Sequence, residues 1–156
     1  MRAREMAESY PTVSVDDDAV AAARLVVRER LPALPALLVL DRDEYPYAIV
    51  PAAHIVKALV PDFVQEDPRL AAVIDDRLDD DARESMTGRS VAEWLPRGHL
   101  HTAAVVGPDA SPMQIATFMT RMDTAVVAVV ERDGDQAMLI GAVVAAAVLD
   151  HFIGGS

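Results

Sequence analysis

Four histidines and several runs of aspartate are the residues in this sequence best suited to chemistry. His99 and His101 stand two residues apart where a strand is expected to begin, so both imidazoles could face one side and bind a metal ion. Two imidazoles make an incomplete zinc site, and the chain has no cysteine to complete it. We therefore predict no metal site, and the role of His99 and His101 stays open.

Carboxylates are abundant, with 25 Asp and Glu against 14 Lys and Arg and a net charge of −11. The triplet Asp16–Asp18 precedes a helical pattern, and we favour helix capping over a cation site because acidic first turns ordinarily mark helix starts. The acidic run from Asp75 to Glu84 is interpreted as a solvated helix face rather than a cation site. The net charge also argues against nucleic acid and anionic membranes as partners.

Catalytic patterns are missing from the sequence. It contains no glycine-rich phosphate loop, no nucleophile elbow and no Ser-His-Asp set that can be argued, and no pair of acid/base carboxylates can be singled out. The N-terminus has no apolar signal region, and the longest apolar run, Ala137–Leu149, is shorter than the roughly 18 residues that span a bilayer. With no cysteine, the chain fits a reducing cytoplasm. We predict a cytoplasmic protein that is not an enzyme and does not insert into membranes.

The elements that position these residues follow one order twice. In the first half we expect a strand at Thr12–Val15, a helix burying Val20, Ala23, Val27 and Leu31 and stopped by Pro32, strands at Ala36–Leu40 and Tyr47–Val50, and a helix from Pro51 to Leu59. In the second half we expect a short helix at Ser90–Leu95, a strand at Ala103–Val106, a helix capped by Ser111, strands at Ala125–Val130 and Ala137–Val143 joined by a turn at Gly134, and a helix at Val144–Phe152.

This order divides the chain into three parts. Residues 1–61 form the first domain with an N-terminal lead-in, residues 62–89 an acidic connector with a helix at Pro68–Ala82, and residues 90–156 the second domain. Shifting the chain by about ninety residues lays Thr12 on Thr102 and Leu37–Asp43 on Val127–Asp133. Beyond the hairpin, which is three residues longer in the second copy, the same alignment lays Ala48–Ile55 on Gly141–Val148. We infer an internal duplication, in which each copy buries its apolar sheet face against the other.

The strand with threonine, the acid-capped helix, the apolar strand, the charged turn and the strand that leads into a small-residue helix together resemble a tandem pair of CBS domains, or Bateman module. The resemblance covers nearly the whole chain, from about Met6 to Phe152. It implies an α+β fold in which two β-α-β-β-α units pack through their sheets with pseudo-twofold symmetry. It also implies clefts that hold AMP, ATP or S-adenosylmethionine, and a homodimer that regulates a separate enzyme or transporter.

The chain departs from the pattern that nucleotide-binding members of this family often carry, Gly-x-x-Thr/Ser-x-x-Asp at the junction of the last strand and helix. The matching residues are Ala48, Pro51 and His54 in the first copy, and Gly141, Val144 and Ala147 in the second. Neither copy keeps the hydroxyl or the carboxylate. His54 could meet a phosphate when protonated, although a histidine at the rim of the protein is the simpler interpretation.

The resemblance places the ligand site at Thr12, Val13, Tyr47, Ile49, Pro51, His54, Thr102, Ala103, Val144 and Ala147. For Thr12 and Thr102, plain β-propensity explains the residue type as well as a ligand does. The function we predict is a stand-alone ligand-sensing module that modulates a partner protein. The alternative is a structural or dimerisation module that has lost nucleotide binding.

Overall fold

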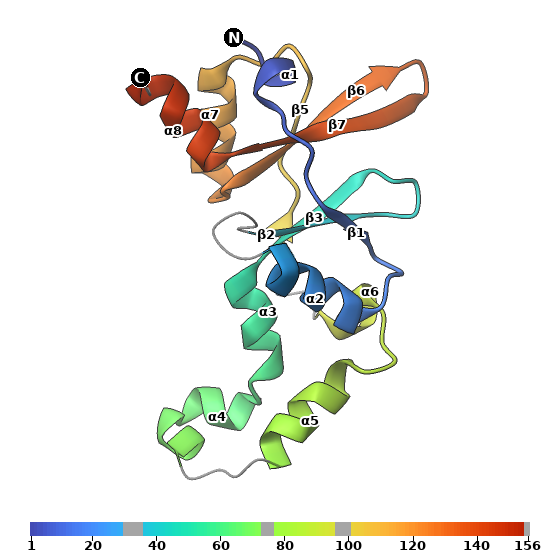
Figure 1. Cartoon of the computed structure of the whole chain (residues 1–156), viewed down its shortest axis with the longest axis vertical. Coiled ribbons are helices and arrows are strands. Elements are labelled where there is room, and N and C mark those ends of the chain that lie inside the picture. Colours follow the sequence, from blue (N-terminus) through green and yellow to red (C-terminus); the bar gives the residue numbers. More distant parts are fainter. Residues whose placement is uncertain (30–35, 73–76, 96–100, 155–156) are drawn as a thin grey trace.

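A computed structural model describes residues 1–29, 36–72, 77–95 and 101–154 of the chain. The fold is α+β and consists of two units that stack through their β-sheets (Figure 1). In the second unit α7 (Pro112–Met122) and α8 (Ala145–Ile153) lie at one end of the sheet. In the first unit α3 (Ala52–Leu59) lies at that end, and α2 (Ala19–Glu29) runs along the face of the sheet. In both units a β-hairpin extends at the other end. The two hairpins point to the same side of the molecule, which gives it a helix end and a hairpin end.

The first unit is built around β2 (Ala36–Leu40), which lies parallel to β1 (Thr12–Ser14) and antiparallel to β3 (Pro46–Pro51). Helices α2 and α3 complete the unit. Four of the five β2 residues are buried, as expected for a strand covered on both faces.

The second unit repeats this arrangement. Strand β6 (Val126–Asp133) lies parallel to β5 (Val105–Val106) and antiparallel to β7 (Gln136–Val144). Helices α7 and α8 accompany this sheet. The two units follow the same strand and helix order, which confirms the duplicated β-α-β-β-α organisation.

A segment from each half crosses over and completes the sheet of the other half. We call residues 7–11 the first crossing segment and residues 101–104 the second. The lead-in helix α1 (Ala3–Met6) packs in the core of the second unit, and Glu8 pairs with Ala142 of β7. The short β4 (His101–Thr102) joins the first sheet beside β3. The expected single strand at Ala103–Val106 is therefore wrong, because the chain crosses there from one sheet to the other.

The strand pairings also correct the alignment of the two copies. Val13 pairs with Val39 and Val106 with Val129, so Val13 corresponds to Val106 and Thr12 to Val105. Laying Thr12 on Thr102 is therefore wrong. Later pairings bear out the three extra residues of the second hairpin: Val50 and Val143 occupy matching places opposite Leu37 and Val127.

Polar side chains cap the N-termini of α2, α6 (Val91–Trp94) and α7, where capping was expected. Asp18 accepts a hydrogen bond from the Ala21 backbone N–H (3.0 Å), and Ser111 accepts one from Gln114 N–H (3.2 Å). Helix α6 starts with the capping box of Ser90 and Glu93. Each such cap is worth about 1 kcal/mol because it satisfies backbone donors that have no partner within the helix.

The buried side of α2 differs in part from the expected one. Ala19 and Ala22 are buried, whereas Val27 is 75% exposed, and Leu31 and Pro32 lie outside the described residues. Val20 and Ala23 are partly buried and pack against the core of the first unit as expected, so the predicted stripe is wrong only at Val27. The larger residues of this core come from other elements: Leu37, Val39, Val50, Val91, Trp94 and Leu95.

The connector is not the single helix expected over Pro68–Ala82. It contains α4 (Asp62–Glu66), the 3₁₀ helix η1 (Pro68–Ala72) and α5 (Arg77–Met86). These elements project from the first unit as an arm (Figure 1). The division of the chain at residues 61 and 89 stays a prediction.

Gly141 lies close against the backbone of Glu8 from the other half of the chain. A Cβ at this position would overlap the carbonyl oxygen of Glu8. We expect Gly141→Ala to lower the free energy of unfolding by about 1–3 kcal/mol, because either the crossing segment or β7 must shift. Urea denaturation would measure the loss.

The matched control is Gly107→Ala, where an added Cβ meets nothing within 4 Å. Its effect should stay within about 0.5 kcal/mol. Equal stability of the two variants would show that Glu8 does not constrain β7.

Candidate functional site

The two sheets meet in an apolar layer that forms the floor of any site between the units. Its buried members are small or β-branched residues from both halves together with Leu38: Ala36, Leu38, Ile49, Ala103, Val126, Ala128 and Ala142. This layer holds no buried polar side chain, in common with the rest of the described chain. A ligand between the units must therefore find its polar contacts at the ends of the layer.

Four of the expected ligand residues come together where β3 meets the second crossing segment. Thr102 pairs with Ala48 next to Tyr47 and Ile49, and the Ala103 N–H donates to the Tyr47 carbonyl oxygen (3.3 Å). Thr102 and Tyr47 are exposed, whereas Ile49 and Ala103 are buried in the layer between the sheets. Only the first two can offer side-chain atoms at the surface.

The other expected residues lie apart from this group. Val13 is buried in the core of the first unit, and Ala147 packs against the core of the second. Thr12 is exposed on β1. Pro51 and Val144 occupy matching places at the ends of β3 and β7, opposite Ala36 and Val126.

These strand ends lead into α3 and α8, whose N-termini, like those of the short helices α1 and α4, carry no side-chain cap. Pro51 precedes α3 and Val144 precedes α8, and neither side chain accepts a hydrogen bond from the helix backbone. The half-buried His54 lies in the first turn of α3. Helices α2, α6 and α7 are capped by side chains, so the two uncapped starts sit at matching junctions of the duplicated fold. Free N–H groups and the positive end of the helix dipole favour an anion there.

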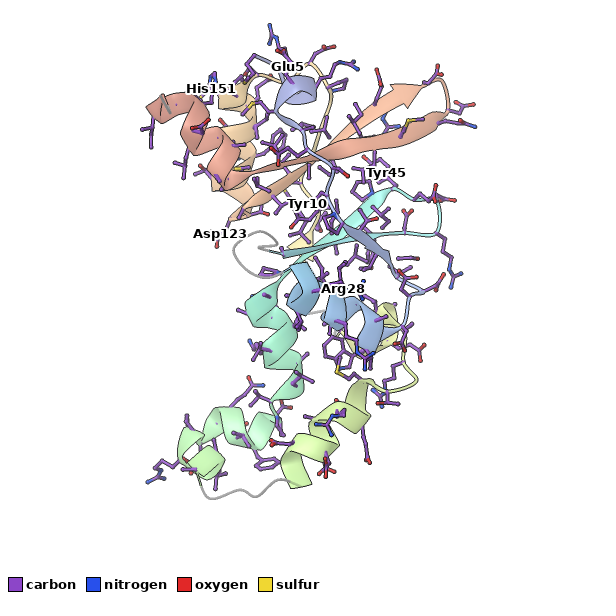
Figure 2. The ribbon with its side chains drawn as sticks, in the orientation of Figure 1. Glu5, Tyr10, Arg28, Tyr45, Asp123 and His151 are labelled. Carbon is purple, nitrogen blue, oxygen red and sulfur yellow. The ribbon has the colours of Figure 1, made fainter. Side chains whose placement is uncertain are left out.

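Tyr10, which the sequence analysis did not single out, closes one side of the layer between the sheets. It lies on the first crossing segment (Figure 2), and its hydroxyl donates to the backbone carbonyl oxygen of Ala36. At the matching place in the other half, Thr124 donates to the Val126 carbonyl oxygen (3.0 Å). The two sides of the layer are therefore filled differently, and only the first carries an aromatic ring.

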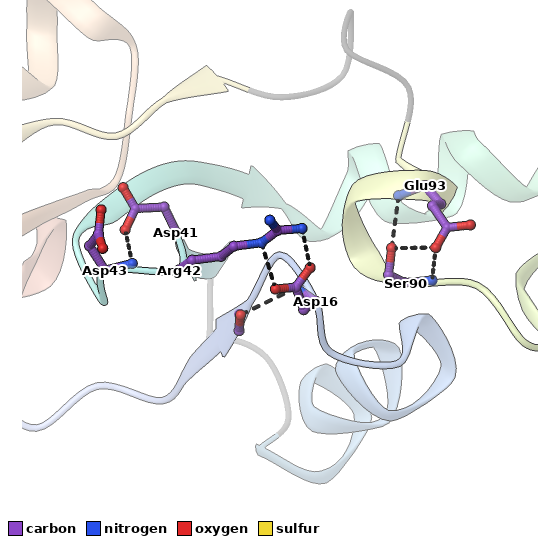
Figure 3. Close-up of polar contacts among 7 residues, drawn as sticks. Asp16, Asp41, Arg42, Asp43, Ser90 and Glu93 are labelled. Atoms are coloured by element: carbon purple, nitrogen blue, oxygen red, sulfur yellow. Dashed lines mark hydrogen bonds and ion pairs between the residues drawn. The ribbon is translucent and has the colours of Figure 1, made fainter.

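The hairpin end has a different character. Grooves there are lined by both hairpins, and the largest measures about 770 Å³. Asp16 pairs with Arg42 (Oδ2–Nε 3.0 Å), and Asp41 accepts the Asp43 N–H (2.9 Å), as Figure 3 shows. The matching Arg132 lies over the Tyr45 ring, 5.8 Å from its centre, and so links the two hairpins.

Metal binding finds no support in the described residues, which include no cluster of three or more histidine or acidic residues arranged to hold an ion. His99 lies outside them, and for His101 only the backbone is described, in β4. The described part of the chain also has no helix long and apolar enough to span a membrane.

Comparison with known proteins decides the family. A CBS domain-containing protein of unknown function from Kribbella flavida is 35% identical, with a TM-score of 0.83, over 98% of this chain and 99% of that one. The chain belongs to the CBS-domain family. It is a CBS pair, as the resemblance implied, and its two units are the two CBS domains.

More distant CBS structures share the fold. CBSX2 in complex with AMP is 15% identical (TM-score 0.63), over 98% of this chain and 96% of that one. The CBS domain pair of the protein MJ0100, in complex with 5′-methylthioadenosine and S-adenosylmethionine, is 13% identical (TM-score 0.63), over 100% and 98% of the two chains. No family model and no curated protein sequence matches the chain.

The hydroxyl of Tyr10 has a measurable titration signature. Burial raises the pKa of Tyr10 to about 12. The unfolded pKa is about 10, so the folded state holds the proton more tightly. This stabilisation is present below about pH 10 and is lost as pH rises towards and through 12.

We therefore expect the free energy of unfolding to fall over that window in the wild type, and to fall less in Tyr10→Phe. The control Tyr47→Phe removes an exposed hydroxyl and should behave like the wild type. Ultraviolet titration should find one late tyrosine that only Tyr10→Phe removes. Three tyrosines titrating together in the folded protein would contradict the buried position of Tyr10.

Proposed function

We propose that this CBS pair is a ligand-sensing regulatory module that binds an adenosine phosphate, such as AMP or ATP, at the helix end of the layer between its two domains. The observation that carries the proposal is the pair of uncapped helix starts behind Pro51 and Val144. Both helix starts can bind a phosphate, because their backbone N–H groups lack partners within the helix and can donate hydrogen bonds to it.

His54, in the first turn of α3, would add positive charge for a phosphate when protonated. Thr102 and Tyr47 lie apart from these junctions, nearer the hairpin end of β3, and could meet only another part of the ligand. The AMP complex of CBSX2 and the S-adenosylmethionine complex of MJ0100 support this class of ligand. The protein would act on a separate enzyme or transporter, by a ligand that favours one of two module geometries. We assign it no catalytic residue.

Loss of the ribose acceptor supports the second candidate, a structural or dimerisation module. Val144 and Ala147 offer a ligand no hydroxyl or carboxylate, and Pro51 takes the hydroxyl position in the first domain. A nucleotide that binds without a ribose acceptor must be held mainly through its phosphates. The ligand-sensing proposal therefore predicts weaker binding of S-adenosylmethionine than of AMP or ATP.

Ligand binding can be tested by thermal unfolding and calorimetry with AMP, ATP and S-adenosylmethionine. A ligand at 100 times its dissociation constant should stabilise the protein by about 2.7 kcal/mol. We expect AMP and ATP to do so, and His54→Ala to weaken their binding several-fold.

The control Lys57→Ala changes an exposed residue one turn further along α3 and should alter affinity less than twofold. No stabilisation by any of the three ligands at millimolar concentration would reject ligand sensing and leave the structural module.

We also propose that the module is a homodimer that pairs through its helix end. Large apolar side chains are exposed on α7 and α8: Met113, Phe118, Leu149, Phe152 and Ile153. Val27 and Val56 add exposed apolar atoms on α2 and α3. Exposed apolar surface on neighbouring helices is typical of protein interfaces, and burying it would offset the loss of motional freedom on association.

The helix-end dimer predicts that Phe118→Glu combined with Leu149→Glu yields a monomer in sedimentation equilibrium, because two charges would be buried in the interface. The control Phe63→Glu places one such charge on the exposed arm and should leave the dimer intact. A wild type that sediments as a monomer at high micromolar concentration would contradict the proposal.

A further inference from the structure

The outer edge of β7 is an unprotected sheet edge at the hairpin end. The first crossing segment covers only its far part, where Glu8 and Ala142 exchange two backbone hydrogen bonds of 3.0 Å each. From Gln136 to Ile140 the described residues make no backbone hydrogen bond on that side. An edge of this kind is a template for pairing with another extended chain.

The strand register shows which backbone groups are free. Gly134, with φ of +64°, and Asp135 form a two-residue turn that makes Asp133 and Gln136 the closing pair of the hairpin. Bonded and non-bonded pairs alternate along an antiparallel ladder, so Ala137 and Leu139 direct their N–H and C=O groups away from β6. These are the groups that an added strand would use.

The matching edge in the first domain is protected, so the two duplicated domains differ at this sheet edge. There β4 covers Ala48 and Ile49, and β3 begins at Pro46, which has no N–H to donate. The second hairpin is three residues longer, has no proline on its edge, and exposes 69% of Met138. The Glu8 pairing shows that β7 already accepts an extended segment.

The charge around this edge indicates what would pair with it. The groove of about 770 Å³ beside β7 includes Glu44 and Asp133, and the adjoining groove includes Asp135. Among the described residues, no ion pair reaches these three carboxylates. We propose that the β7 edge, Gln136–Ile140, binds an extended basic segment of a partner protein by β-strand addition, with its lysines or arginines against these carboxylates.

A second copy of this chain fits the same edge poorly. The β7 edge of a second copy, Gln136–Ile140, brings no lysine or arginine to meet these carboxylates, and both copies carry a net charge of −11. Like charges opposed across strands destabilise the pairing. The proposal is independent of whether the helix end binds a nucleotide.

The probe is a fluorescein-labelled peptide of seven residues that alternates lysine and valine, with both ends blocked. We expect it to bind the full chain in fluorescence anisotropy, and a glutamate-for-lysine peptide not to bind. Only one edge of an added strand faces β7. N-methylation of the lysine residues or of the valine residues should therefore abolish binding in one case and spare it in the other.

Two protein variants separate the groove from general electrostatic attraction. Glu44→Lys combined with Asp133→Lys should weaken binding about tenfold. Asp81→Lys combined with Glu84→Lys makes the same change in charge on the exposed side of α5 and should weaken it less than twofold. Equal effects of the two double variants would overturn the proposal.

Amide hydrogen exchange reads out the backbone pairing directly. The amides of Ala137 and Leu139 should become protected when the peptide is added, while those of α5 should not. Binding without this protection would overturn strand addition. A β7 edge that pairs with a second copy would show the same protection without peptide, at concentrations where the protein associates, and that result would also reject the basic segment.

Discussion

Backbone exchange between the two CBS domains is the constraint on which the rest of the structure depends. Glu8 bonds to Ala142 in the second sheet, and Ala103 bonds to Tyr47 in the first. Each domain thus lends a segment to the sheet of the other, and the apolar layer between the sheets is closed from both sides. Separating the domains would expose this layer and leave backbone groups without partners, which is costly inside a protein.

The same exchange gives the molecule two chemically different ends. Strands β3 and β7 run from one end to the other, so each carries an uncapped helix start at one end and a hairpin at the other. The helix end offers backbone N–H groups and suits an anion. The hairpin end offers carboxylates and a free strand edge, and suits a cation-rich chain. A ligand at one end and a partner at the other would share two rigid strands, which is a simple physical basis for coupling.

Divergence between the two copies matters more for function than their similarity. Tyr10 of the first crossing segment fills one side of the apolar layer, whereas the second crossing segment has Ala103 at the equivalent position. Pro46 and β4 protect one sheet edge, whereas the equivalent edge of β7 is open. Duplication supplies two equivalent strand-to-helix junctions and two equivalent sheet edges, and these substitutions make the members of each pair unequal.

The sequence by itself determined the order of helices and strands within each repeated unit, the duplication and the capping residues, because periodicity and capping are local properties of a few neighbouring residues. It did not determine the crossing at Ala103, the true partner of Thr12 or the exposure of Val27. Those features depend on which sheet a segment joins and on which helix face meets it, and both are decided by packing between residues far apart in the sequence. The open edge of β7 is likewise a tertiary feature. Its sequence is that of an ordinary strand, and only the fold shows that, within the described residues, it pairs with β6 on one side and with nothing on the other from Gln136 to Ile140.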